Sequence, residues 1–203
     1  MTTLIFDIDG TLIDSVSMYL LGLQETMRRY DREYAIEDLR FSNGIPSSDT
    51  AARLGFTGAA ADAMVAQWTA DSQTHAGDVK WIPGLEKVMG ELVARGTAMG
   101  VVTSKDTKQY AVDEARFGFD RFFQTAVRAH DAKRNKPFGD PIELAMQRLN
   151  VTRDTTVYVG DTATDAQAAV AAGVPFALCT WTTQDLAEPV AHYLKTPADL
   201  LML

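Results

Sequence analysis

Five short apolar segments constrain the fold of this chain more than any other feature. Most of them are separated by stretches with helical periodicity, and they occupy residues 2–8, 97–104, 122–127, 155–161 and 175–181. Strands that alternate with helices are typical of a parallel sheet with helices on its faces. Near-continuous apolar runs also suit strands that are buried on both faces. The sequence therefore predicts an α/β fold built around a parallel sheet.

The first two predicted strands lie far apart in the sequence. Between Asp14 and about Pro83 the residue pattern is helical, and no segment reads convincingly as a strand. This stretch is too long for a simple crossover between neighbouring strands. We therefore expect an inserted helical cap domain over residues 14–84, and a core domain formed by residues 1–13 and 85–203.

Several predicted helices carry recognisable start and stop signals. The segment "DPIELAMQRLNV" is expected to begin with Asp140 as N-cap, Pro141 as first helical residue and Glu143 as capping-box partner. The segments "GLEKVMGELVARG" and "TDAQAAVAAGV" are expected to stop at Gly96 and Gly173.

Composition excludes some classes of function. The 203 residues carry a net charge of -8, with 46% hydrophobic and 23% charged residues, which is an ordinary globular mixture. The acidic balance argues against nucleic acid as a partner, because binding to a phosphate backbone needs a basic face. A small anionic substrate is still compatible with it, since one local cation or metal ion can outweigh the global charge.

The sequence also bears on the cellular setting. The first ten residues lack the basic and apolar regions of a signal peptide, and no apolar run approaches the roughly 20 residues of a membrane helix. The single cysteine, Cys179, excludes an internal disulfide and reads as a core residue. We expect a cytoplasmic protein with no membrane partner.

Polar side chains follow three of the predicted strands. Asp7 and Asp9 end the first, Thr103 ends the second together with Ser104, and Asp161 and Asp165 follow the fourth. The carboxyl ends of parallel strands form the ligand crevice of an open sheet, so these groups are expected to meet there. Crowded carboxylates need a cation among them, and Mg²⁺ prefers oxygen ligands. A phosphoryl group would complete the charge balance.

Four motifs in this order, "DIDGTLIDS", "VVTSK", "KPFGDP" and "GDTATD", span residues 7 to 165. Together they resemble the haloacid dehalogenase superfamily, and more narrowly its phosphoglycolate-phosphatase-like branch. The resemblance implies a Rossmann-like, three-layer α/β/α core with a small helical cap. It also implies a Mg²⁺-dependent phosphatase that hydrolyses a small-molecule phosphomonoester through an aspartyl-phosphate, as a monomer or weak homodimer.

The resemblance assigns catalytic roles to four residues. Asp7 would be the nucleophile, and Asp9 would protonate the leaving oxygen and then activate water. Thr103 would donate a hydrogen bond to a phosphoryl oxygen, and Lys136 would neutralise the phosphoryl group. Backbone N–H groups would help to hold the phosphate at residues 8–10 and 104, which include Gly10 and Ser104.

The resemblance also implies a metal site. Mg²⁺ would be held by the Asp7 carboxylate, the Asp9 main-chain carbonyl and Asp161. Asp165 would orient water molecules or Lys136 rather than bind the ion.

Other features leave the substrate open. Residues 41–55 resemble the specificity loop of the helical cap, with Arg40 and Arg53 as either surface residues or substrate contacts. Trp68 reads as cap core or as a substrate-facing side chain, and Lys105 as solvated or in contact with substrate. A sugar phosphomutase or an inorganic pyrophosphatase on the same fold is an alternative function. A regulatory module that binds a phosphorylated ligand is the non-enzymatic one.

Overall fold

A computed structural model of the chain describes residues 2–183 and 185–203. In this part of the chain, six parallel strands form one sheet in the order β3-β2-β1-β4-β5-β6. Their bounds are Thr3–Phe6 for β1, Met99–Val102 for β2, Thr125–Val127 for β3, Thr156–Gly160 for β4, Phe176–Cys179 for β5 and His192–Leu194 for β6. The five predicted strands are therefore confirmed, and β6 is an addition to them.

Strand order reverses at β1. The chain builds outward from β1 through β2 to β3, and then returns to the other side of β1 with β4. Phe6 of β1 is in register with Val101 of β2 and with Val159 of β4. The carboxyl ends of these three strands therefore lie side by side, at the switch point where an open parallel sheet forms its ligand crevice.

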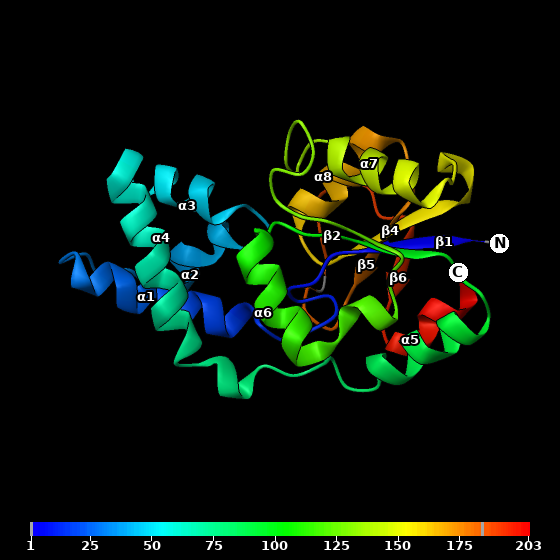
Figure 1. Cartoon of the computed structure of the whole chain (residues 1–203), viewed down its shortest axis with the longest axis horizontal. Coiled ribbons are helices and arrows are strands. Elements are labelled where there is room, and N and C mark those ends of the chain that lie inside the picture. Colours follow the sequence, from blue (N-terminus) through cyan, green and yellow to red (C-terminus); the bar gives the residue numbers. More distant parts are fainter. Residues whose placement is uncertain (1, 184) are drawn as a thin grey trace.

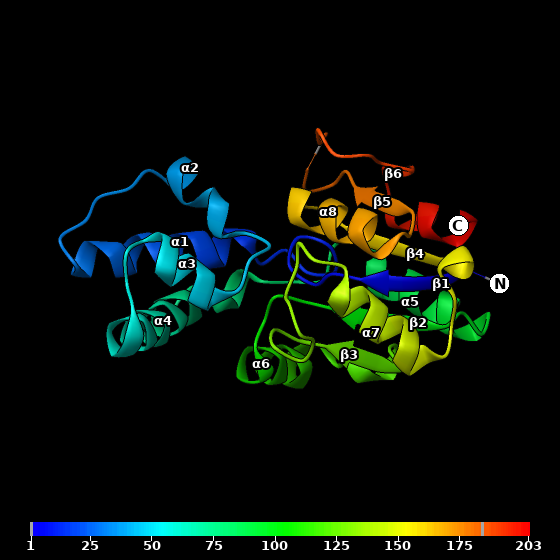
Figure 2. The same ribbon diagram turned by 90° about the horizontal axis from the view of Figure 1, so that it is seen from above.

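Helices cover both faces of the sheet, which confirms the three-layer α/β/α core (Figures 1 and 2). Helices α5 (Leu85–Ala94) and α6 (Thr107–Phe117) lie on one face, and α7 (Asp140–Leu149) and α8 (Ala163–Ala172) on the other. Side chains alternate along β1 accordingly, because Leu4 and Phe6 belong to the first hydrophobic core and Ile5 to the second. The strand β1 therefore lies between the two hydrophobic cores, and its side chains are buried on both faces of the sheet.

The long segment between β1 and β2 folds into a separate group of helices beyond the carboxyl ends of the strands (Figure 1). It contains α1 (Val16–Arg29), α2 (Ile36–Leu39), α3 (Ser47–Arg53) and α4 (Gly58–Gln73). These helices bury their own apolar side chains, with Leu23, Met27, Met64 and Trp68 near the centre. The inserted helices thus have a core distinct from the two cores of the sheet.

Two chain crossings connect the inserted helices to the sheet domain. The N–H of Asp14 donates to the carbonyl of Lys80 at 2.9 Å, and that of Ile82 donates to Leu12 at 2.9 Å. The side chain of Trp81 then packs edge-on against Phe117, Phe119 and Phe122 of the sheet domain. The outgoing and returning chains are therefore held together as one narrow junction.

The predicted start of α7 is wrong by one residue. The helix begins at Asp140 itself, Gly139 occupies the N-cap position, and no side chain caps the helix. The Asp140 carboxylate instead accepts hydrogen bonds from Arg134 at 2.8 and 3.0 Å, and Glu143 accepts one from Arg153. These guanidinium groups, which are charged donors, compete with the backbone for the same oxygens. The predicted stop of α8 is confirmed, because Gly173 caps it in the left-handed region at φ +71°.

The C-terminal segment returns to the sheet. After β6, a 3-10 helix over Pro197–Met202 packs near α5, and Leu200 is buried in the core on that face. Within the described ranges, no helix is long and apolar enough to cross a lipid bilayer.

The contact between α1 and α4 gives a test of packing in the inserted helices. A Cβ at Gly22 would lie 2.5 Å from the backbone nitrogen of Ser72, so Gly22→Ala should overpack this contact and cost about 1–3 kcal/mol. Gly90 of α5 is exposed with open space around it, so the matched control Gly90→Ala should stabilise by roughly 0.5–1 kcal/mol. Calorimetric unfolding of the two variants compares them, and equal midpoints would contradict the close contact.

Candidate active site

Asp7 and Asp161 meet at the switch point because each follows one of two paired strands, β1 and β4. Glycine permits the close approach. Gly10 has φ +79°, and a Cβ on it would lie 2.3 Å from Oδ2 of Asp161. A Cβ on Gly160 would lie 2.7 Å from the side chain of Asp165. No side chain larger than hydrogen fits at either position without moving a carboxylate.

Lys136 lies between two of the carboxylates. Its Nζ donates to Oδ1 of Asp7 and to Oδ1 of Asp165, both at 2.7 Å, and lies 3.3 Å from the Tyr158 hydroxyl. All four side chains are buried. Burial alone would lower the pKa of Lys136, but the charges of Asp165 and Asp7 more than offset it and hold that pKa above its usual range. The ammonium therefore stays charged.

Carboxylates outnumber the cation in this cluster. Oxygen atoms of Asp7, Asp161 and Asp165 all lie within 4.8 Å of one another. Burial raises the pKa of Asp7 to about 7, although Lys136 opposes the shift. Burial, with the charges of Asp165 and Asp7, also raises the pKa of Asp161 well above its usual range. The three carboxylates are removed from water and have one ammonium group among them. Binding of a further cation would therefore stabilise their charged forms.

The hydrogen bonds show which oxygens could bind that cation. Asp161 accepts from Thr11 through Oδ1, but its Oδ2 is buried with no partner among the described residues. Both oxygens of Asp165 are already used, one by Lys136 and Tyr158 and the other by Thr162. A buried set of hard oxygen donors fits a divalent metal ion, with Asp161 Oδ2 as the most available atom.

Asp9 has a different lysine partner. Its Oδ1 accepts from Nζ of Lys105 at 2.7 Å and also from the hydroxyl of Ser15. Lys105 is only 4% exposed, so it is neither solvated nor free to reach far into the pocket. The two aspartates of the first motif are thus held by separate cations.

The remaining predicted phosphate-binding groups lie along the same edge. Thr103 is buried directly after β2, and its hydroxyl accepts from the N–H of Lys105 at 3.2 Å. The Ser104 hydroxyl donates to the carbonyl of Gly44 in the inserted helices at 2.9 Å. The N–H of Gly10, which was predicted to hold phosphate, instead donates to the Ile13 carbonyl at 2.8 Å. Gly10 therefore contributes close packing and a tight turn in this structure.

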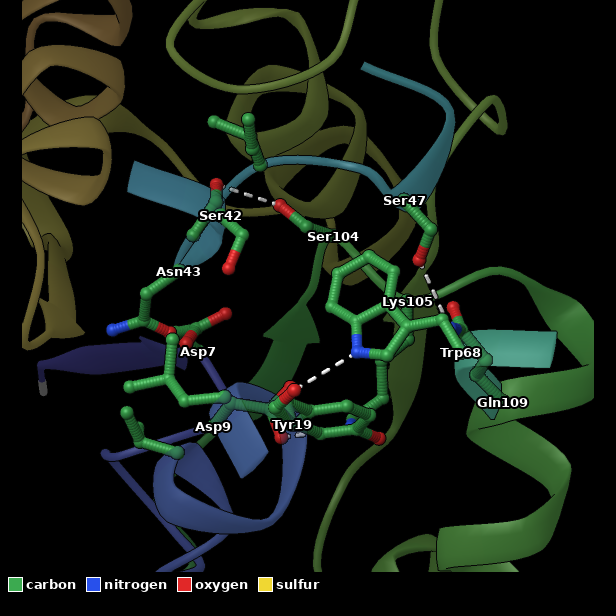
Figure 3. Close-up of a pocket in the computed structure, with 14 residues that line it drawn as sticks. Asp7, Asp9, Tyr19, Ser42, Asn43, Ser47, Trp68, Ser104, Lys105 and Gln109 are labelled. Carbon is green, nitrogen blue, oxygen red and sulfur yellow. Dashed lines mark hydrogen bonds and ion pairs between the residues drawn. The ribbon is translucent and has the colours of Figure 1, made fainter. Parts of the chain in front are cut away.

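A small pocket opens between these groups and the inserted helices (Figure 3). The sheet domain contributes Asp7, Asp9, Ser104, Lys105 and Gln109, and the inserted helices contribute chiefly Tyr19, Ser42, Asn43, Gly44, Ile45, Ser47 and Trp68. Its free space is about 50 Å³, which is room for only a small polar group. Side chains from both parts of the chain therefore enclose the site.

The structure distinguishes between the residues that the sequence left open. Residues 42–45 and Ser47 of the predicted specificity loop do line the pocket, whereas Arg40 and Arg53 are exposed and do not. The Arg53 guanidinium lies over the Phe41 ring at 5.8 Å. Trp68 belongs to the core of the inserted helices and also lines the pocket, with its indole N–H bonded to the Tyr19 carbonyl at 2.9 Å.

Sequence reasoning missed several side chains of the site. Tyr158 lies in the predicted strand 155–161 and Thr11 in the first motif, but neither was singled out as a site residue. A usable signal existed for Tyr158, because a buried phenol needs a hydrogen-bond partner. Asn43 lies within the predicted specificity loop, residues 41–55, but was not singled out there, and Tyr19 lies in a predicted helix without a motif.

Comparison with known proteins identifies the family. The model of the haloacid dehalogenase-like hydrolase family matches residues 4–179. The chain therefore belongs to this family and is a hydrolase.

Individual relatives cover almost the whole chain. It is 28% identical over 195 residues to the pyrophosphatase PpaX of Oceanobacillus iheyensis, a match that covers 96% of this chain and 88% of that protein. A crystal structure of a Lactobacillus plantarum protein assigned as a phosphoglycolate phosphatase superposes with a TM-score of 0.87 at 26% identity, covering 100% and 99% of the two chains. CbbY of Rhodobacter sphaeroides, in complex with phosphate, shares the fold with a TM-score of 0.83 at 20% identity, covering 98% and 96%.

The acidic cluster predicts stabilisation by a divalent cation. An ion that binds only the folded chain raises the unfolding midpoint by mass action, so millimolar Mg²⁺ or Mn²⁺ should raise it by a few degrees. Asp161→Asn should abolish the shift, whereas Asp154→Asn, which changes an exposed carboxylate before the opposite end of β4, should keep it. Differential scanning fluorimetry with and without EDTA measures this effect. An equal shift in both variants would place the ion elsewhere.

Proposed function

We propose that this hydrolase is a Mg²⁺-dependent phosphatase that acts on a small phosphomonoester through an aspartyl-phosphate. The observation that carries the proposal is the Lys136 bridge between Asp7 and Asp165, beside a buried Asp161 oxygen that no described residue contacts by a hydrogen bond. Phosphoryl transfer needs mainly positioning and charge stabilisation, and this cluster offers both.

In the first step, Oδ of Asp7 attacks phosphorus and forms a new P–O bond. The bond from phosphorus to the leaving oxygen breaks, its electron pair stays with that oxygen, and Asp9 donates the proton. In the second step, Asp9 accepts a proton from water, and the water oxygen attacks the same phosphorus. The bond from phosphorus to Oδ of Asp7 breaks, its electron pair returns to the Asp7 carboxylate, and inorganic phosphate leaves. The separate lysine partners of Asp7 and Asp9 support this division of roles.

Other side chains would stabilise the phosphoryl group. Lys136 would balance the negative charge shared by the phosphoryl group and Asp7, with Asp165 holding its ammonium in place. Thr103 would donate from its hydroxyl to a phosphoryl oxygen, with the N–H of Ser104 beside it. The Asp7 carboxylate, the Asp9 carbonyl and Asp161 would hold Mg²⁺, which when bound supplies positive charge to the reacting phosphoryl oxygens.

We further propose that residues 14–84 form a cap that moves to admit substrate. The pocket is closed by hydrogen bonds between the two parts, from Ser104 to Gly44 and from Gln109 to Ser47. The small free space of the pocket favours opening before substrate enters. The paired crossings near Asp14 and Ile82 would serve as the hinge. Closure of such a cap excludes water and selects substrates.

Inorganic pyrophosphate is a second candidate substrate. The PpaX relative of Oceanobacillus iheyensis, named as a pyrophosphatase, matches this chain over 96% of its length, and the pocket has room for a small leaving group. Measuring kcat/KM with Mg²⁺ for phosphoglycolate, pyrophosphate, sugar phosphates and 4-nitrophenyl phosphate would rank these substrates. Phosphate transfer to a sugar acceptor would instead favour a mutase. Binding of a phosphorylated ligand with no EDTA-sensitive turnover would favour a regulatory module.

Asp7→Asn tests the nucleophile. We expect kcat to fall by roughly 10³-fold or more, because the amide cannot form the covalent intermediate. The unfolding midpoint should fall little, since Asp165 still binds Lys136. Acid-quenched mass spectrometry should detect a phosphorylated peptide containing Asp7 in the wild-type chain only. Turnover by the variant at the wild-type rate would remove Asp7 from the mechanism.

A further inference from the structure

A second buried lysine has no role in the reaction described so far. Lys105 follows β2 in the loop after Thr103, and its side chain is 4% exposed. Removing an ammonium from water costs several kcal/mol unless the charge is paired and hydrogen-bonded. The partners of Lys105 therefore indicate what its burial achieves.

Three groups from three different elements surround its ammonium. Nζ lies 2.7 Å from Oδ1 of Asp9, 2.6 Å from the hydroxyl of Tyr19 in α1, and 2.9 Å from Oδ2 of Asp113 in α6. The contact with Asp113 is an ion pair rather than an aligned hydrogen bond. Lys105 thus joins the loop after β1, the inserted helices and the sheet domain.

Asp9 is held through only one of its two oxygens. Oδ1 accepts from Lys105 and from the Ser15 hydroxyl, and no hydrogen bond within the described ranges reaches Oδ2. Two donors on one oxygen fix the plane and direction of a carboxyl group. The other oxygen is left for the pocket that Asp9 lines together with Lys105 and Tyr19 (Figure 3).

We propose that Lys105 is the positioning residue of Asp9, and that Tyr19 and Asp113 hold the lysine in place. The inference rests on the proposed function, in which Asp9 protonates the leaving oxygen. A proton donor must lie about 2.6–3.2 Å from the atom that it protonates, so a freely rotating Asp9 would spend little time in reach. Asp113 contributes a second negative charge beside Lys105, in addition to that of Asp9, and it has no role in the proposed reaction.

The proposal predicts a dependence on the leaving group. When the bond from phosphorus to an alkyl oxygen breaks, the electron pair leaves on a strongly basic alkoxide that needs the Asp9 proton. A nitrophenolate is weakly basic and leaves with its electron pair unprotonated. A badly positioned acid therefore slows alkyl phosphates more than 4-nitrophenyl phosphate. General destabilisation of the fold would slow both equally.

Lys105→Met should lower kcat/KM, which reports the steps through departure of the leaving group and not the later hydrolysis, by roughly 10²-fold on phosphoglycolate, near the low end of the effect of general acid catalysis. On 4-nitrophenyl phosphate it should lower kcat/KM by only a few-fold. Tyr19→Phe, which removes one hydroxyl contact, should shift the two rates in the same direction by less. The matched control is Lys87→Met, because Lys87 is exposed on α5 and lines neither of the cavities beside the site. It should leave both rates unchanged.

Asp9→Asn on the same two substrates separates this inference from the proposed function. If Asp9→Asn lowers kcat/KM equally for both substrates, the acid role of Asp9 fails. If Asp9→Asn shows the leaving-group dependence and Lys105→Met does not, the positioning role of Lys105 is wrong.

Crystal structures provide a readout independent of turnover. The wild-type chain should show Asp9 in a single rotamer with Oδ1 on Lys105, and Lys105→Met should show it displaced. An unchanged Asp9 in the variant overturns the inference whatever the rates.

Discussion

A lysine ammonium buried between two carboxylates is the interaction on which this site depends. Lys136 reaches Asp7 and Asp165 at 2.7 Å each, across sequence separations of 129 and 29 residues. Charges buried this deeply stabilise a protein only when their geometry is accurate, because the cost of removing them from water is large. The parallel sheet supplies that accuracy. It fixes the ends of β1 and β4 in register, and the backbone of Gly160 lets α8 bring Asp165 close to them. The packing that fixes the sheet therefore also positions the charged groups of the site.

Both aspartates of the first motif are paired with a buried lysine. Asp7 and Asp9 are two residues apart, a spacing that would put them on one face of a continuing strand. β1 ends at Phe6, however, and the turn at Gly10 redirects the chain, so that the two carboxylates contact Lys136 and Lys105 respectively. Two neighbouring acids thus receive different surroundings, which is how one site accommodates two different tasks.

Local patterns were enough to predict the sheet and the acidic edge, but not the contacts that complete the site. The buried strands stand out as apolar runs, and the carboxylates at their ends follow from the geometry of a parallel sheet. The edge strand β6 was missed because it is three residues long and two of its side chains are exposed. The N-terminus of α7 was misplaced because Arg134 binds the Asp140 carboxylate. Two of the three partners of Lys105, Tyr19 and Asp113, lie on helices and outside any motif, so local sequence gave no reason to place them at the site.

The junction between the two parts of the chain has a geometric consequence. Because the crossings near Leu12 and Ile82 are bonded side by side, the proposed opening of the inserted helices would be a rotation about this junction. In such a rotation, displacement grows with distance from the axis. Tyr19, in the first turn of α1, would travel little, whereas the loop around Gly44 would travel far and break its bond to Ser104. The pocket would then open while Lys105 keeps its contacts with Asp9 and Tyr19. Asp9 would therefore already be oriented when the substrate binds.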